Sequence, residues 1–346
     1  MKIPMRLLVA VVLVLGLAGQ AAPAAASSSG GGSNPTGHSR FKALVFSKTA
    51  AFRHDSIPTG VAAIRQLGVE HGFTVDATED ASAFTDRNLA RYDVVVWLST
   101  TGDVLDEAQQ AAFERYIRHG GGYAGIHAAS DTEYDWPWYG GLVAAYFRDH
   151  PGAVNPQFQT ATVKVLDRDT AATRDLPRRW VREEEWYNFR TNPRHTVRVL
   201  AEVDEGTYDP RGYSVPGGSP GMGRHHPISW CQPYGGGRAF YTAMGHKAEY
   251  YSEPLFLAHL LGGIRMAAGA ARFACGREGS PGVDLAPGLP DLRAFPLDRW
   301  LAVVRTAAAT SPHRPSKTLT VLNLSTSFTT TSETLSVTFT TPARGR

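Results

Sequence analysis

The stretch of sequence that decides the fold reads Gly120-Gly121-Gly122-Tyr123-Ala124-Gly125-Ile126-His127-Ala128-Ala129-Ser130. Its glycines end a preceding helix, a short strand follows, and small residues come after the histidine at the strand's end. Small residues there let neighbouring backbone approach closely, as a sharp turn from strand to helix requires. In sheet hydrolases such a turn presents a nucleophilic serine or cysteine. Because this chain has His127 instead, amidotransferase or cysteine-hydrolase chemistry at this position is excluded.

Strands and helices alternate outward from this stretch. Short apolar runs predict buried strands at residues 42–47, 73–75, 93–98 and 123–127. Residues 58–71 carry apolar side chains at near-helical spacing, and Asp106 is suited to cap a helix that runs to Ile117. The alternation predicts an α/β fold, with an open, mostly parallel sheet and helices on both faces.

In the second half of the domain the sequence pattern changes, and we expect loop-rich insertions there. Alternating runs predict further strands at residues 161–166, 196–201 and 238–243. Residues 253–266 carry apolar side chains on one stripe and predict a final helix. We expect one compact domain over residues 40–276.

The first residues predict export. Lys2 and Arg6 precede an apolar run that ends at Ala18, and small residues follow it through Ala26. This is the pattern of a signal peptide over residues 1–26. The run is shorter than the roughly 20 residues of a membrane-spanning helix. We therefore expect a secreted protein that has no membrane attachment after cleavage.

Two segments lie outside the predicted domain. Residues 27–39 are rich in serine and glycine and predict a flexible linker. Residues 277–346 begin rich in proline and glycine and end rich in serine and threonine. That tail is consistent with a linker, a disordered segment or a fragment of a further module.

Charge and cysteine content narrow the classes of protein. The 346 residues include 35 Lys and Arg against 32 Asp and Glu, a formal net charge of +3, which argues against a nucleic-acid partner bound by a basic patch. Cys231 and Cys275 are the two cysteines. In an exported chain an even pair is a candidate disulfide. Because neither lies at a strand-to-helix turn beside a base, we favour this bridge over a catalytic thiol.

The candidate catalytic residues follow strands. In an open parallel sheet the ligand lies beyond the carboxyl ends of the strands, and His54 and His127 occur at such ends. His246 lies in a loop beside glycine, and Glu185 precedes two aromatic residues. The candidates are His54, His127, Asp131, Glu185 and His246.

These side chains suit two kinds of chemistry. In acid-base catalysis His127 or His54 would be a general base, and Glu185 or Asp131 an acid or an orienting group. Neutral imidazoles are also common metal ligands, and either carboxylate could complete a divalent metal site. No two of the histidines have the His-x-x-x-His spacing of a strong metal motif. We prefer acid-base chemistry, assign no cofactor, and leave the metal open.

Other side chains are candidates for substrate binding. The aromatic ones could stack on sugar faces, and the polar ones could hold hydroxyl or anionic groups; they are Trp136, Trp138, Trp186, Tyr187, His226 and Arg238. Aromatic residues are more often part of the core, and Arg238 could equally form a structural ion pair. His150 and His259 are expected to be buried histidines bonded to backbone.

Several segments occur together, in order, in a known family. They are Phe52-Arg53-His54-Asp55-Ser56, Ser99–Leu105, Gly121–Ala129, Trp136–Gly140, Glu184–Phe189, His226–Trp230 and Gly237–His246. Through them the chain resembles the ThuA-like (trehalose utilisation) proteins, and in particular a secreted, glycosyl hydrolase-like branch. The resemblance implies a class I glutamine amidotransferase-like, flavodoxin-like fold over about 41–268. It also implies a sugar-related role.

Three functions are consistent with these features. We expect a carbohydrate-processing protein that cleaves or modifies a glycoside or keto-sugar, a small molecule or an oligosaccharide, by histidine and carboxylate acid-base chemistry. A non-catalytic carbohydrate-binding module would keep the aromatic residues without convergent histidines and carboxylates. A metal-dependent hydrolase acting on another substrate is the third. The polar residues favour an enzyme.

Overall fold

Five parallel strands form the centre of the structure, a computed structural model that describes residues 41–152, 154–213 and 218–276. They are β1 (Lys42–Phe46), β2 (Thr74–Thr78), β3 (Val94–Leu98), β4 (Gly122–Ile126) and β11 (Gly237–Thr242). Their order is β2-β1-β3-β4-β11, and every neighbouring pair is parallel. This is the strand order of flavodoxin-like sheets, whose ligands bind at the carboxyl edge.

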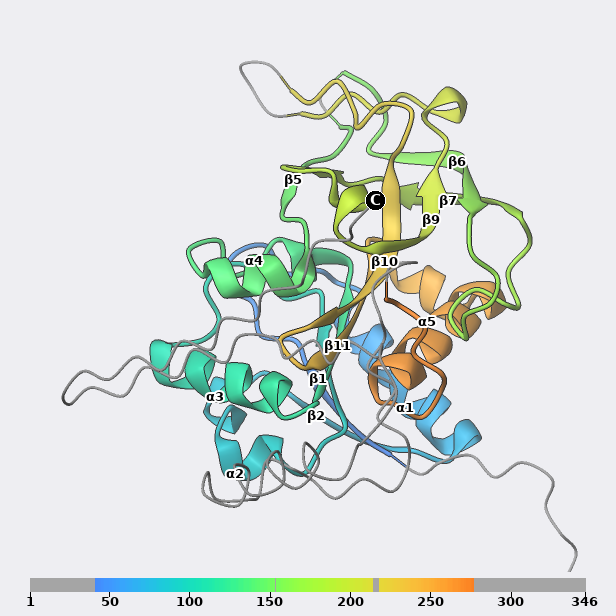
Figure 1. The fold of residues 1–346 in the computed structure, drawn as a ribbon. Helices are drawn as coiled ribbons and strands as arrows, with labels where there is room; N and C mark the ends of the chain where they lie inside the picture. The colour runs from blue at the N-terminus through green and yellow to red at the C-terminus, as the bar shows by residue number, and fades with distance from the viewer. Residues whose placement is uncertain (1–40, 153, 214–217, 277–346) are drawn as a thin grey trace, which may run out of the picture. The chain divides into compact units, whose positions relative to one another are not determined.

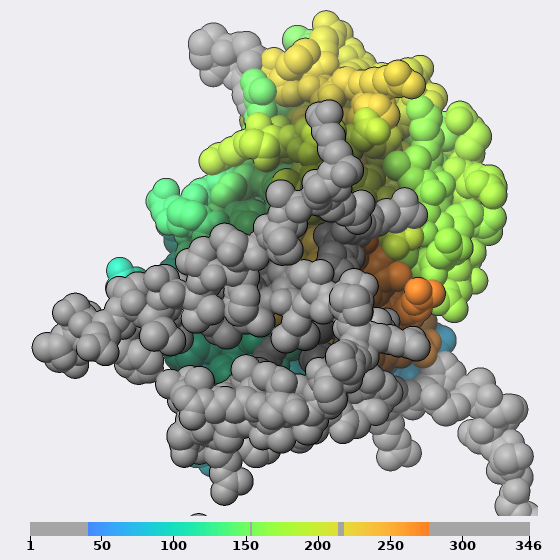
Figure 2. Space-filling view, in the orientation of Figure 1, coloured from blue at the N-terminus to red at the C-terminus, as the bar shows by residue number. Residues whose placement is uncertain are grey.

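Antiparallel strands extend the same sheet to nine strands. They are β10 (Pro227–Tyr234), β9 (Arg198–Val203), β6 (Phe158–Val165) and β7 (Arg179–Glu185), in that order after β11. A separate pair consists of β5 (Phe147–Asp149) and β8 (Asn188–Phe189). In the space-filling view the green to yellow residues of this extension and its loops gather at one end of the molecule (Figure 2).

Helices cover both faces of the parallel strands. The helix pair α1 (Ile57–His71) and α5 (Pro254–Ala267) packs on one face. The other face carries α2 (Asp86–Leu89), α3 (Glu107–Arg118) and α4 (Pro137–Val143), as Figure 1 shows. Short 3-10 turns connect elements at Ala81–Ala83, His127–Ser130, Pro193–His195, Glu205–Thr207 and Ala248–Ser252. Asp106 caps α3 and forms a capping box with Gln109.

The predicted fold class is confirmed, and the sheet is mixed rather than parallel throughout. The sequence analysis did not identify β7, because five of its seven residues are arginine or glutamate and mask the usual apolar period. Arg182 and Glu184 both point inward and are buried as an ion pair with a 3.0 Å contact. The pairing of these charges replaces the apolar pattern by which a buried strand is normally recognised.

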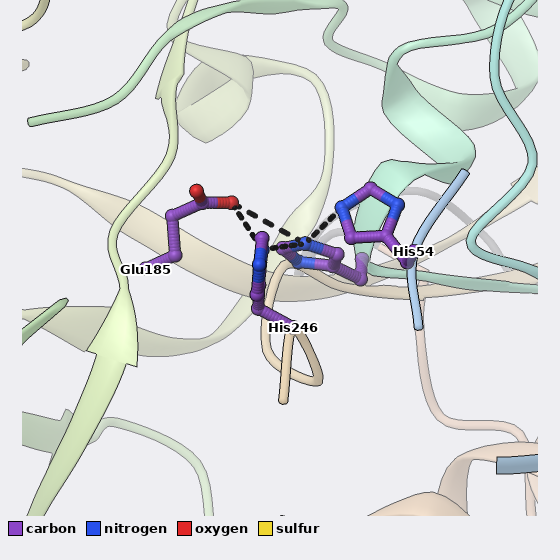
Figure 3. Close-up of side chains that lie close together, drawn as sticks. His54, Glu185 and His246 are labelled. Carbon is purple, nitrogen blue, oxygen red and sulfur yellow. Dashed lines mark hydrogen bonds and ion pairs between the residues drawn. The ribbon is translucent and has the colours of Figure 1, made fainter. Parts of the chain in front are cut away.

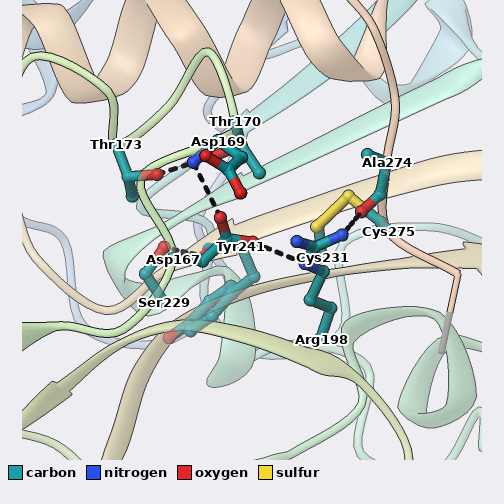
Figure 4. Close-up of a disulfide and its surroundings, with 10 residues drawn as sticks. All are labelled: Asp167, Asp169, Thr170, Thr173, Arg198, Ser229, Cys231, Tyr241, Ala274 and Cys275. Carbon is teal, nitrogen blue, oxygen red and sulfur yellow. Dashed lines mark hydrogen bonds and ion pairs between the residues drawn. A yellow bond between two sulfur atoms is a disulfide. The ribbon is translucent and has the colours of Figure 1, made fainter. Parts of the chain in front are cut away.

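The predicted disulfide is present between Cys231 of β10 and Cys275 (Figure 4). Beside it, the Arg198 guanidinium donates to the carbonyl oxygen of Ala274 and pairs with Asp167. The bridge and the arginine together hold the segment after α5 against the antiparallel strands.

The segments predicted to be a signal peptide, a linker and a C-terminal tail lie outside the described residues. Among the residues that the structure describes, no helix is long and apolar enough to cross a membrane. The predictions of cleavage, of the linker and of the tail therefore stay predictions.

Reduction of the disulfide should destabilise the domain. The bridge closes a loop across 44 residues, and the loss of that constraint on the unfolded chain is worth about 4 kcal/mol. Urea denaturation of the full chain with and without dithiothreitol measures this difference. A Cys231→Ser/Cys275→Ser double variant is the control and should not respond to the reductant. Equal stability of the oxidised and reduced wild-type protein would contradict the prediction.

Candidate active site

Three histidines reach one place from three parallel strands. His54 follows β1, His127 follows β4 and His246 lies in the loop after β11, so all three stand at the carboxyl edge of the sheet. Glu185 reaches the same place from the end of β7. Figure 3 shows the side chains of His54, Glu185 and His246 pointing toward one another. We call His54, His127, Glu185 and His246 the histidine cluster.

The Nε2 atom of His127 stands at the centre of the cluster. It lies 3.1 Å from His54 Nε2, 3.2 Å from His246 Nδ1 and 3.4 Å from Glu185 Oε2. The Tyr187 hydroxyl lies 3.0 Å from the same nitrogen. His246 Nδ1 is also 2.7 Å from Glu185 Oε2. Of these side chains only that of His246 has appreciable exposure, at 16%.

The backbone at His127 is held in an uncommon conformation. Its φ of 52° lies in the left-handed region, which costs a residue other than glycine of order 1–3 kcal/mol. Two positions earlier, a Cβ on Gly125 would lie 2.4 Å from the Tyr123 hydroxyl, so glycine is needed there. The predicted sharp turn is therefore present, and strain of this kind concentrates at functional positions.

A hydrogen bond to the residue after the neighbouring strand β11 determines which nitrogen of the His127 ring carries a hydrogen. Its Nδ1 lies 2.8 Å from the carbonyl oxygen of Ala243. Because a carbonyl can only accept, Nδ1 carries the hydrogen and Nε2 of the neutral ring presents a lone pair to the cluster.

Glu184 holds the turn that carries His246. Its buried carboxylate accepts the backbone N–H of Gly245 at 2.9 Å and that of His246 at 3.3 Å. Gly245 has a φ of 120°, and a Cβ there would lie 2.8 Å from the Tyr251 hydroxyl. Burial raises the pKa of Glu184, and its ion pair with Arg182 and these hydrogen bonds oppose that rise.

The charge state of the cluster follows from burial and from its contacts. Burial, together with the neighbouring histidines, lowers the pKa of His54 to about 2, so His54 is neutral. Burial alone would raise the pKa of Glu185, but the close contacts of its carboxylate with the His127 and His246 rings outweigh burial and hold this pKa well below its usual range. Burial raises the pKa of Tyr187 far above its usual value, so it keeps its proton. The cluster therefore combines an ionised Glu185 with a neutral His54, and Tyr187 keeps its proton beside them.

A second layer surrounds Glu185. His150 Nε2 lies 3.2 Å from Glu185 Oε1, and the Gln157 side chain donates to the same oxygen. His150 also contacts backbone, as expected, through Nδ1 and the Pro151 carbonyl. Its position beside the cluster was missed because β5, the strand before it, is too short to stand out in the sequence.

Tyr187, Asp131 and His226 lie in or near this layer. Tyr187 is buried against His127, with ring centroids 4.4 Å apart, rather than open for stacking. Asp131 accepts a hydrogen bond from the Tyr134 hydroxyl at 2.5 Å, and burial raises its pKa. His226 does not contact the histidine cluster through these bonds; its ring bridges the Tyr187 carbonyl and the Glu205 carboxylate.

The structure does not bring the tryptophans or Arg238 into the cluster. Trp136 and Trp138 stack on each other beside α3 and α4, and Trp186 is buried with its Nε1 bonded to the Gln159 carbonyl. Arg238 begins β11 at the opposite, amino edge, where it bonds the Ala267 carbonyl.

Other rings flank the cluster and are exposed. Phe52, 63% exposed, contacts the His54 ring edge-on at 4.8 Å between centroids. Tyr213, 40% exposed, contacts the ring of His150 at 4.6 Å. These two side chains were not singled out from the sequence, where nothing distinguishes an exposed ring from a buried one.

The fold and the site define an α/β protein whose parallel strands have the flavodoxin-like order and whose sheet carries a buried histidine cluster at its carboxyl edge. A profile of the ThuA family, described as trehalose utilisation, matches residues 42–267. The chain therefore belongs to the ThuA family, which confirms the resemblance at the level of the family.

Solved structures agree with this assignment. A ThuA-like protein from Bacteroides uniformis has a TM-score of 0.55 and 26% sequence identity, over 68% of this chain and 94% of that chain. A ThuA-like protein from Parabacteroides merdae has a TM-score of 0.52 and 21% identity, over 66% of this chain and 90% of that chain, and shows the same fold. No curated protein matches the sequence.

Two adjacent glutamates should differ sharply in their effect on stability. Glu184→Ala takes away the buried carboxylate partner of Arg182, which keeps only the part-exposed Glu253 at 3.4 Å, and it removes two backbone hydrogen bonds, so we expect a loss of about 3–5 kcal/mol. Glu183→Ala breaks an exposed pair with Lys247 and should cost less than about 1 kcal/mol. Urea denaturation measures both, and hydrogen exchange at Gly245 should accelerate only in the first variant. Similar losses in the two variants would show that Glu184 does not hold the turn.

Proposed function

We propose that the protein is a secreted carbohydrate-processing enzyme that acts on a glycoside or a keto-sugar at the histidine cluster. The observation that carries the proposal is the convergence of three imidazoles and a carboxylate, delivered by four separate elements, on one point at the carboxyl edge of the sheet. The family's description, trehalose utilisation, supports a sugar as the substrate. The disulfide supports an oxidising compartment.

An enzyme is a better account of this cluster than a sugar-binding module. A module needs exposed rings and hydroxyl-binding groups, and gains nothing from three imidazoles packed against one another. At His127 the chain tolerates a strained backbone and aligns the ring through Ala243. Such an arrangement is typical of a group that must be held ready for reaction.

The protonation states favour proton abstraction over hydrolysis by paired carboxylates. Hydrolysis by two carboxyl groups needs one that is protonated to donate to the leaving oxygen. Glu185 is ionised, and Glu184 is committed to Arg182 and to backbone N–H groups. Burial raises the pKa of Asp131, but Asp131 accepts the hydrogen bond of Tyr134 and is not one of the four converging side chains. A base-rich site with one anion suits removal of a proton from a sugar hydroxyl or from a carbon beside a carbonyl. Within the proposed substrate class, a keto-sugar offers that acidic carbon.

Replacement of His127 by Ala should reduce turnover by at least ~100-fold, the usual range for loss of acid-base assistance. The measurement is product formation from a panel of disaccharides, oligosaccharides and their keto derivatives. His54→Ala should behave in the same way. His119→Ala is the matched control, because His119 is exposed at the end of α3.

Thermal unfolding of each variant separates a lost function from a lost fold. Turnover that is unaffected in a folded His127→Ala protein would remove the cluster from the reaction. Wild-type protein that binds a sugar of the panel but converts none would favour the binding module.

A further inference from the structure

Hydrogen bonding alone does not account for the close contacts around His127 Nε2 in the histidine cluster. The lone pair of His127 Nε2 faces His54 Nε2, His246 Nδ1 and the Tyr187 hydroxyl, all within 3.2 Å. One lone pair cannot accept hydrogen bonds from three donors with good geometry. A cation placed between the rings would instead take up the imidazole and carboxylate electron pairs together.

The spacing of the donor atoms matches a metal coordination shell. Ligands that each lie about 2.1 Å from a tetrahedral ion are about 3.4 Å from one another. His127 Nε2 lies 3.1, 3.2 and 3.4 Å from the other donor atoms of the cluster, and no two of the four are more than 4.8 Å apart. In a tetrahedral shell every pair of ligands has this separation, so the most distant donor atoms must approach by up to about 1.4 Å. His246 Nδ1 and Glu185 Oε2, now 2.7 Å apart, must separate slightly.

Groups outside the cluster orient its ligands as they do in metal sites. Metal-bound histidines commonly donate their second nitrogen to a carbonyl, as His127 does to Ala243. Glu185 uses Oε2 toward the cluster, while Gln157 and His150 contact its other oxygen. Glu184 fixes the backbone of His246.

The donor set selects the kind of metal. Magnesium and calcium prefer shells made of oxygen, whereas three imidazole nitrogens with one carboxylate suit zinc and its first-row neighbours. The partial exposure of His246 provides a side from which an ion can enter.

We propose that His54 Nε2, His127 Nε2, His246 Nδ1 and Glu185 Oε2 bind one divalent transition-metal ion of the zinc class. The role of this ion in turnover rests on the proposed function, but its binding does not. The four side chains would hold the ion, and the ion would supply Lewis-acid polarisation of a sugar oxygen.

Metal binding is tested on the purified full chain after removal of metal with a chelator. Titration with Zn²⁺, followed by calorimetry and elemental analysis, should give one ion per chain, and Mg²⁺ and Ca²⁺ should not compete. His54→Ala and Glu185→Gln should each weaken Zn²⁺ binding by at least ~100-fold, while His119→Ala should bind as the wild type does. Co²⁺ substitution should give the visible absorption of a four-coordinate or five-coordinate site.

The outcomes separate this proposal from the proposed function. Zn²⁺ affinity that is unchanged in folded His54→Ala and Glu185→Gln proteins, or absence of binding to the wild type, overturns the metal site. Sugar turnover that depends on His127 but resists the chelator overturns a catalytic metal and keeps the proposed function. One tightly bound ion without turnover of any sugar in the panel supports the metal site and counts against the proposed function. His54→Gln provides a second variant if His54→Ala does not fold.

Discussion

The parallel pairing of β4 with β11 is the constraint on which the site depends. Ile126 and Thr242 are partners in the register, so the next residues, His127 and Ala243, leave the sheet side by side although they are 116 positions apart in the chain. The His127 ring can therefore donate to the Ala243 carbonyl, and its free nitrogen then faces away from the sheet. The turn to His246 starts at the same place, so one register sets the positions of two cluster residues.

The antiparallel extension supplies what the parallel strands lack, an anion. Burying a carboxylate costs several kcal/mol unless it is paired and hydrogen-bonded, and β7 buries two in succession. Glu184 is compensated by Arg182 and two backbone N–H groups. Glu185 is compensated by the imidazoles, by His150 and by Gln157. The first carboxylate shapes the loop that the second one faces, so fold and site are stabilised by the same charges.

The sequence was sufficient to predict the parallel half of the fold and to place its histidines after the strands. Strands β1, β3 and β4 are continuous apolar runs, and a general rule places ligands at their carboxyl ends. For that reason His54 and His127 could be named without coordinates. The distance between these two side chains could not be predicted, because strand order depends on long-range pairing that no local pattern encodes.

Other misses share one cause, which is that burial depends on tertiary partners. Glu184 lies in a run of three glutamates, and only the pairing of β7 shows that it faces inward. Likewise Trp136 and Trp186 are residues of the type that stacks on sugar rings, but they pack into the core.

The burial of the histidine cluster limits which parts of a substrate can reach it. His54, His127 and Glu185 are almost fully buried, and His246 is the member whose side chain has appreciable exposure. A bulky glycan therefore cannot surround the cluster. For the sugar substrate that we propose, this burial means that one or two of its atoms reach the cluster while the rest stays outside, beside exposed rings such as Phe52 and Tyr213.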